Sequence, residues 1–167
     1  MALCSSETQV DPPGGAYLNA YASIVGAWRG GARIAEWNPD TGKLWPPLRA
    51  ALQTPVSAFV WWQGEEDAGL GLWPVGAYLA ELRGLVGRVR HAAHQPRLLV
   101  VIVELGPTYR ASSTVAEQRQ FVETDAHAVF VRTGDLPYRD GTHMAPDGYR
   151  AVAQRIAQRI MAQGRSR

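Results

Sequence analysis

The chain has 167 residues, of which 46% are hydrophobic and 19% charged, and its formal net charge is +2 at pH 7. This length fits a single domain over residues 1–167 and is sufficient for a sizeable core. The small net charge argues against nucleic acid as a partner, and no segment has the ~18 consecutive apolar residues of a membrane span. The N-terminal residues lack a basic segment followed by an apolar run, so we expect no signal peptide, and localisation stays open.

The first predicted strand is the apolar run "ASIVGAW" (22–28), which is followed by Gly30 and Gly31. A loop rich in proline and glycine, "WNPDTGKLWPP" (37–47), comes next and is long enough to line a site. The second predicted strand, "VSAFVWW" (56–62), changes abruptly into the polar sequence "QGEED". The abrupt change has two interpretations: a solvated turn, or polar groups aimed into a pocket.

Helical and apolar segments then alternate. Apolar residues recur at helical spacing in 74–94, and the β-branched run "RLLVVIVEL" (97–105) predicts a third strand. In 114–126, Thr114 and Glu117 have the spacing of a capping box. A fourth strand is predicted at "HAVFVRT" (127–133), and a last helix begins at Pro146.

This alternation predicts an α/β fold, with a central parallel sheet between two layers of helices. Ligands of such sheets bind beyond the carboxyl ends of the strands. Three polar clusters are predicted at that edge: the Gly30-Gly31 pair, the residues that begin at Gln63, and a loop with Asp140 and His143. A carboxylate beside a histidine can orient the ring and stabilise its charged form, as a general base requires.

Three blocks in this order, "GGARIAEW", "VWWQGEEDAG" and "DGTHMAPDGYRAVAQRI", resemble the SGNH/GDSL hydrolase superfamily, in particular its sialate-type carbohydrate acetylesterases. The resemblance covers about residues 22 to 160. It implies a flavodoxin-like three-layer fold and a serine esterase that removes acetyl or other short acyl groups, on carbohydrate, without a cofactor or metal.

The resemblance also implies roles for individual residues. His143 would be the general base and Asp140 its orienting partner. The backbone N–H of Gly31, with Gly30 as the alternative, and the side-chain amide of Gln63 would line the oxyanion hole. Glu65 and Asp67 would order the surrounding loop.

The family's Gly-x-Ser block, which carries the nucleophile, has no clear counterpart here. Ser6 is the preferred candidate, after a short strand at residues 1–4, and Ser5 is the second. Cys4, the single cysteine, is a further alternative. If no residue serves as nucleophile, the chain would be a degenerate binding or structural module, alone or within an assembly with other chains.

Two further hypotheses concern a metal site and the arginines near the C-terminus. Oxygen ligands and an imidazole could hold a divalent metal ion, although no known ligand spacing supports it: Glu65, Glu66, Asp67, Asp140 and His143. Arginines near the C-terminus are interpreted as a solvated helix face rather than a phosphate-binding patch: Arg150, Arg155, Arg159, Arg165 and Arg167.

Overall fold

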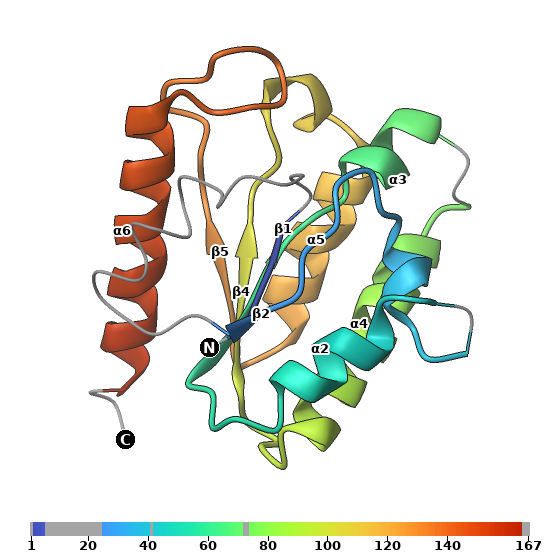
Figure 1. Cartoon of the computed structure of the whole chain (residues 1–167). Coiled ribbons are helices and arrows are strands. Elements are labelled where there is room, and N and C mark those ends of the chain that lie inside the picture. The colour runs from blue at the N-terminus through green and yellow to red at the C-terminus, as the bar shows by residue number, and fades with distance from the viewer. Residues whose placement is uncertain (1, 6–24, 41, 72–73, 165–167) are drawn as a thin grey trace.

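The structure is a computed structural model that describes residues 2–5, 25–40, 42–71 and 74–164 (Figure 1). Five strands form one sheet in the order β2-β1-β3-β4-β5, and every neighbouring pair is parallel. The strands are β1 (Ala2–Ser5), β2 (Val25–Gly26), β3 (Ala58–Trp62), β4 (Leu99–Val103) and β5 (Ala128–Val131). The predicted parallel sheet is therefore confirmed.

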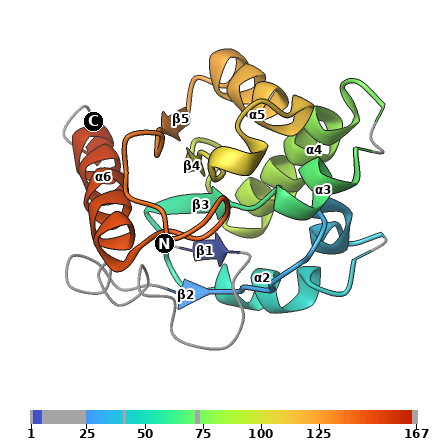
Figure 2. The same ribbon diagram turned by 90° about the horizontal axis from the view of Figure 1, so that it is seen from above.

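Helices cover both faces of the sheet, as the view along it shows (Figure 2). Among the described helices, one face of the sheet carries α6, and the other carries α2, α4 and α5. The helical segments are η1 (Ile34–Trp37), α2 (Trp45–Ala51), α3 (Glu65–Leu70), α4 (Ala77–Ala92), η2 (Pro107–Tyr109), α5 (Ser113–Thr124) and α6 (Pro146–Gly164). The result is the predicted three-layer α/β/α arrangement.

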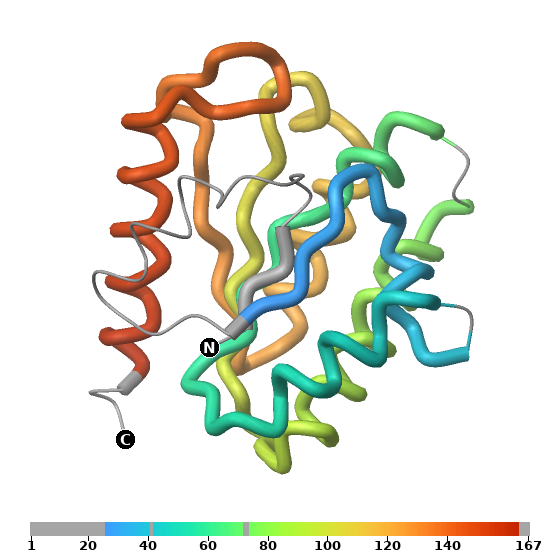
Figure 3. The backbone as a smooth tube through the Cα atoms, viewed as in Figure 1, coloured from blue at the N-terminus to red at the C-terminus, as the bar shows by residue number. Residues whose placement is uncertain are grey.

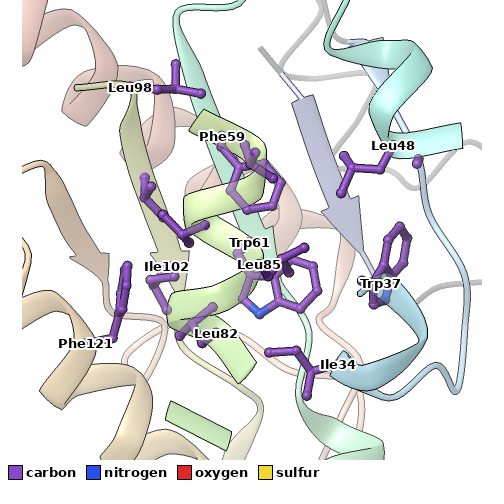
Figure 4. Close-up of a cluster of buried hydrophobic side chains, with 14 of the residues drawn as sticks. Ile34, Trp37, Leu48, Phe59, Trp61, Leu82, Leu85, Leu98, Ile102 and Phe121 are labelled. Carbon is purple, nitrogen blue, oxygen red and sulfur yellow. The ribbon is translucent and has the colours of Figure 1, made fainter. Parts of the chain in front are cut away.

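Alternating side chains of the strands supply two hydrophobic cores. In β3, Phe59 and Trp61 pack with α4, whereas Ala58 and Val60 pack with α6, because successive strand residues face opposite ways. Figure 4 shows the larger cluster, where the Trp37 and Trp61 rings meet edge to face at 5.8 Å between centroids. Each fully buried large side chain contributes about 1.5–3 kcal/mol through loss of apolar surface from water.

Several predicted bounds need correction. Of the predicted strand 22–28, only Val25–Gly26 is strand among the described residues. The predicted loop 37–47 ends inside α2, because Pro46 and Pro47 occupy the first helical turn, where a missing N–H costs no helical hydrogen bond. The short N-terminal strand is confirmed as β1, although residue 1 lies outside the described residues.

The predicted capping box at Thr114 and Glu117 is wrong. The N-cap of α5 is Ser112, whose hydroxyl accepts a hydrogen bond from the Val115 N–H. The Glu117 carboxylate instead accepts hydrogen bonds from the N–H groups of Gly76 and Leu79, at the start of α4. A carboxylate is favourable there because it satisfies open N–H groups at the positive end of the helix dipole.

Across the described ranges, no helix combines the length and the apolar character that crossing a bilayer requires.

Candidate active site

The predicted polar clusters lie at the carboxyl edge of the sheet. Gln63 directly follows β3, and the backbone trace shows the loops after β4 and β5 side by side at the top of the molecule (Figure 3). A backbone hydrogen bond of 3.0 Å from the Thr108 N–H to the Gly141 carbonyl oxygen joins these two loops. Asp140 and His143 therefore lie at the same edge as Gln63.

Asp140 and His143 form a compact pair within one loop. The Nδ1 atom of His143 lies 3.0 Å from Oδ2 of Asp140, and the Asp140 Oδ1 accepts hydrogen bonds from the backbone N–H groups of Thr142 and His143. Both side chains are about half exposed, at 47% for Asp140 and 40% for His143. This contact engages the Nδ1 atom of the imidazole, so a general-base role would fall to the other ring nitrogen, Nε2.

Hydrogen bonding keeps Asp140 ionised. The N–H groups of His143 and Thr142 and the His143 ring lower the pKa of Asp140 well below its ordinary range, because all of them favour the charged carboxylate. An ionised Asp140 can stabilise a positive charge on His143 when the imidazole takes up a proton.

The loop that carries His143 is held by close backbone packing. A Cβ on Gly106 would lie 2.6 Å from the Gly141 carbonyl oxygen, so only glycine permits this approach of the two loops. A further contact, 3.4 Å long, joins the Thr142 and Tyr109 hydroxyls.

Glu104 has a role that was not predicted from the sequence. This buried carboxylate follows β4 and accepts hydrogen bonds from the N–H groups of Thr133 and Gly134, where the loop to Asp140 begins. Arg119 neutralises it at 2.6 Å. A glutamate directly after an apolar strand was the available signal, but its partners are 15 to 30 residues away.

Gln63 is almost completely buried, with 1% of its surface exposed. Its amide Nε2 donates to the carbonyl oxygen of Ala32 at 2.8 Å and to Oδ2 of Asp67 at 2.6 Å. Since an amide nitrogen has two N–H bonds, donation to an oxyanion requires that one of these two contacts be exchanged. The predicted oxyanion role stays a prediction.

Asp67 orders the surroundings of Gln63. In addition to the amide, its Oδ2 accepts a 3.0 Å hydrogen bond from the backbone N–H of Ile34 at the start of η1. Asp67 thereby ties α3 to the chain that follows the glycine pair. A loop-ordering role was predicted for both Asp67 and Glu65, and Glu65 is the partly buried first residue of α3.

A buried polar network extends from Gln63 into the core. The Tyr78 hydroxyl donates toward the Gln63 main-chain oxygen at 3.2 Å and accepts hydrogen bonds from the Trp61 indole and the Gln118 amide. Burial, more than any other factor, raises the pKa of Tyr78 far above its ordinary value, so the hydroxyl remains protonated. These contacts bring α4 and α5 together behind Gln63.

The glycines near Gln63 are required by backbone conformation. Gly64 has φ +138° and lies so close to Thr114, Gln118 and Leu105 that a Cβ would contact them at 3.0–3.1 Å. Gly31 has φ +64° and is exposed. Within the described ranges, no acceptor takes the Gly31 N–H, which leaves this predicted oxyanion donor available.

The candidate nucleophiles are at the end of β1. Ser5 is the last strand residue and is in register with Trp62, the residue before Gln63. Ser6, the preferred candidate, lies outside the described residues, and the Cys4 alternative is part of the strand itself.

No group of three or more histidine, cysteine, aspartate or glutamate residues in the described parts of the chain is arranged to hold a metal ion. The metal-site alternative therefore has no support from those parts. The C-terminal arginines that are described include Arg150 and Arg155, which pair with Asp147 and Asp135.

Comparison with solved structures shows the same fold in several proteins. A protein from Arabidopsis thaliana has a TM-score of 0.74 at 20% identity, over 95% of this chain and 72% of that one. A carbohydrate acetylesterase from Xanthomonas citri has a TM-score of 0.64 at 19% identity, over 84% of this chain and 37% of that one. A family 3 carbohydrate esterase from Talaromyces cellulolyticus has a TM-score of 0.67 at 13% identity, over 100% of this chain and 98% of that one.

Sequence comparison is more specific about the family. No curated protein matches the chain. Residues 17–162, however, match the family described as carbohydrate esterase, sialic acid-specific acetylesterase. This match includes the Gly30-Gly31 pair, Gln63 and the Asp140–His143 loop. The chain therefore belongs to this family of carbohydrate esterases and is a carboxylic ester hydrolase.

Proposed function

We propose that the chain is a serine acetylesterase that removes acetyl groups from carbohydrate by a Ser-His-Asp mechanism. The observation that carries this proposal is the 3.0 Å contact between His143 Nδ1 and Asp140 Oδ2 at the edge of the sheet where Gln63 follows β3. Membership of the family supports the ester and the carbohydrate. The specificity for sialic acid that describes this family also supports an acidic sugar as the natural substrate class.

In the first half of the reaction, the serine oxygen attacks the carbonyl carbon of the ester while its proton moves to Nε2 of His143. Asp140 stabilises the resulting imidazolium. The oxyanion accepts hydrogen bonds from the Gly31 N–H and from the Gln63 amide, which exchanges one of its present acceptors for it. When the carbon–oxygen bond breaks, the sugar oxygen takes the proton from His143. Water, activated by the same imidazole, then releases acetate from the serine.

Ser6 is the proposed nucleophile and Ser5 the alternative. The proposal is supported by β1, which ends at Ser5 beside the end of β3. A serine at the end of this strand is thus the best available match to the Gly-x-Ser block that carries the nucleophile in the family. Glu65 is proposed to order the loop beside Gln63.

Acetate release from mono-O-acetylated sugars tests the proposal. We expect hydrolysis of acetyl esters, with a lower kcat/KM for the corresponding butyryl esters. Failure to release acetate from any acetylated sugar or aryl acetate would contradict the proposal and favour the degenerate binding module.

A further inference from the structure

A groove away from the candidate active site lies between α2 and the second half of α4. It has a volume of about 630 Å³, which is within the usual range of small-ligand sites. The second half of α4 ends beside the start of β4, where Arg90 donates to the Leu98 carbonyl oxygen. Tyr78, near the other end of α4, contacts Gln63. At 1.5 Å of helical rise per residue, Gly87 in the middle of the groove lies roughly 14 Å along α4 from Tyr78.

The lining of the groove combines arginines and histidines with an aromatic ring. It includes Trp45 and Arg49 of α2, and Arg88 and His91 of α4, with His94 after that helix. None of the residues that line it is a carboxylate. Two cations are engaged: Arg88 binds Asn38 and the exposed Asp40, and Arg83 binds Thr124. In the described ranges, no acceptor binds the guanidinium of Arg49 or the imidazoles of His91 and His94.

Gly87 lies in the interior of α4, where glycine destabilises a helix relative to alanine. Close packing does not require it, because nothing lies within 4 Å of the position that a Cβ would take. Gly87 lines the groove, so a methyl group there would occupy part of its open space. The glycine preserves the groove and weakens the helix.

His94 follows α4 with φ +52°, a left-handed conformation that favours glycine at the end of a helix. Among the described residues, His94 is the one residue other than glycine that has a positive φ. A residue with a strained backbone is a reason to look for a function at that position. His94 lines the same groove as Gly87. Gly87 and His94 therefore both line the groove at a cost to the stability of α4 or its end, which indicates that the groove has a function.

We propose that this groove is an accessory binding site for an acidic oligosaccharide. Arg49 and the two histidines would bind a sugar carboxylate, as charge-assisted hydrogen bonds favour, while the apolar C–H groups of a pyranose ring would pack against Trp45. The assignment to carbohydrate, rather than to another anion, rests on the proposed function. Such a site would hold one part of a polymeric substrate while another part reaches His143.

Isothermal titration and NMR titration of the whole chain with trigalacturonate and trimeric sialic acid test this proposal. We expect at least one of the two to bind with a Kd of about 1 mM or tighter, and its methyl ester to bind at least tenfold more weakly. Arg49→Gln and His94→Gly should each weaken binding at least threefold. No binding of either acid by the wild-type chain would overturn the proposal, as would equal binding of acid and ester.

Gly87→Ala is the most informative variant because it should raise the stability of the fold while it weakens binding of the acid. The melting temperature should rise by roughly 1–4 °C, while binding of the acid weakens at least tenfold. Gly69→Ala is the matched control: it lies in α3, where a Cβ would make an ordinary 3.9 Å contact with Tyr109, and should leave binding unchanged. Unchanged binding in Gly87→Ala would overturn the proposal; if that variant does not fold, Arg49→Gln and His94→Gly decide.

Two further measurements separate this proposal from its alternatives. A single-stranded oligonucleotide that binds more tightly than both acids, and loses affinity in Gly87→Ala, would overturn the carbohydrate assignment. Hydrolysis of a small aryl acetate should be the same in Gly87→Ala and the wild type. Because binding is measured without turnover, inactivity toward every ester contradicts the proposed function alone, whereas loss of acid binding with intact hydrolysis contradicts the accessory site alone.

Discussion

Two regions at the same edge of the sheet are held in different ways. Gln63 is 1% exposed, and its hydrogen bonds join residues from distant parts of the chain, among them Ala32, Tyr78 and Gln118. His143 is 40% exposed at its side chain, and its partner Asp140 is only three residues away. The first region is built into the core, and the second is a local turn attached to it.

This difference predicts which substitutions lower the stability of the fold and which lower turnover. Loss of a polar group from the Gln63 network leaves buried partners unsatisfied, which costs about 1–3 kcal/mol in stability per group. A half-exposed imidazole can be removed with little effect on the fold, since water replaces its contacts. Substitutions in the Gln63 network should therefore lower stability, whereas substitutions of the Asp140–His143 pair should lower turnover with little effect on stability.

The largest expected effect is that of His143→Ala on turnover. Loss of a general base lowers kcat by roughly 10²–10⁴-fold, while the melting temperature should change by less than about 2 °C because the side chain is half exposed. Hydrolysis of an aryl acetate and thermal unfolding measure the two quantities. Retention of wild-type kcat would remove His143 from the mechanism.

Gln63→Ala should affect both quantities. Loss of one oxyanion donor costs about 10²–10³-fold in kcat, and the buried partners of the amide lose their hydrogen bonds. We expect a lower kcat together with a lower free energy of unfolding in urea. A change in stability with unchanged kcat would mean that Gln63 only supports the loops through Ala32 and Asp67.

Asp140→Asn tests the local turn. The asparagine keeps an acceptor for the backbone N–H groups of Thr142 and His143, but it no longer stabilises an imidazolium. We expect kcat to fall by about 10²-fold, with KM changed by less than about threefold. A larger effect on KM than on kcat would instead assign Asp140 to substrate binding.

Tyr78→Phe tests the buried network with a minimal change. Trp61 and Gln118 both lose an acceptor, so we expect a loss of about 1–3 kcal/mol in the free energy of unfolding. Turnover at a temperature where the variant is folded should fall less than about tenfold. A kcat loss as large as that of His143→Ala would contradict the division between the two regions.

The smallest expected effect concerns acid stability. The pKa of Asp140 is depressed in the folded state, so the carboxylate stabilises the fold above its ordinary pKa of about 3.9, and this contribution is lost as the pH falls toward the depressed value. The difference in melting temperature between the wild type and Asp140→Asn should therefore be greatest above about pH 5 and shrink below about pH 4. A difference that grows on acidification would contradict this sign.

The sheet could be predicted from sequence because its strands are continuous apolar runs. Residues 97–105 and 127–133 contain β4 and β5, and helical periodicity identified α4 and α6. The short helix α2 was missed because it begins within the proline-rich stretch that was interpreted as a loop, and α3 was missed because it begins with three acidic residues. Among the described residues, strand β2 ends at Gly26, two residues before the end of the apolar run, because the chain then turns toward Gly30.

The site was predictable where its contacts are local. Asp140 and His143 were identified because they are three residues apart on one loop. Glu104, Asp67 and Glu117 act through hydrogen bonds to residues that only the folded sheet brings near, so sequence spacing gave no indication of their partners. The orientation of the Gln63 amide depends on such contacts too, and it could not be predicted from the block that contains it.

The central claim is that a serine at the end of β1 acts with His143 on a bound ester. Labelling of the wild-type chain with a serine-directed phosphonate, followed by mapping of the modified peptide, tests it most directly. We predict one stoichiometric adduct, on Ser6, and strongly reduced labelling in His143→Ala. Absence of any adduct, or an adduct on a serine outside the N-terminal pair Ser5 and Ser6, would contradict it.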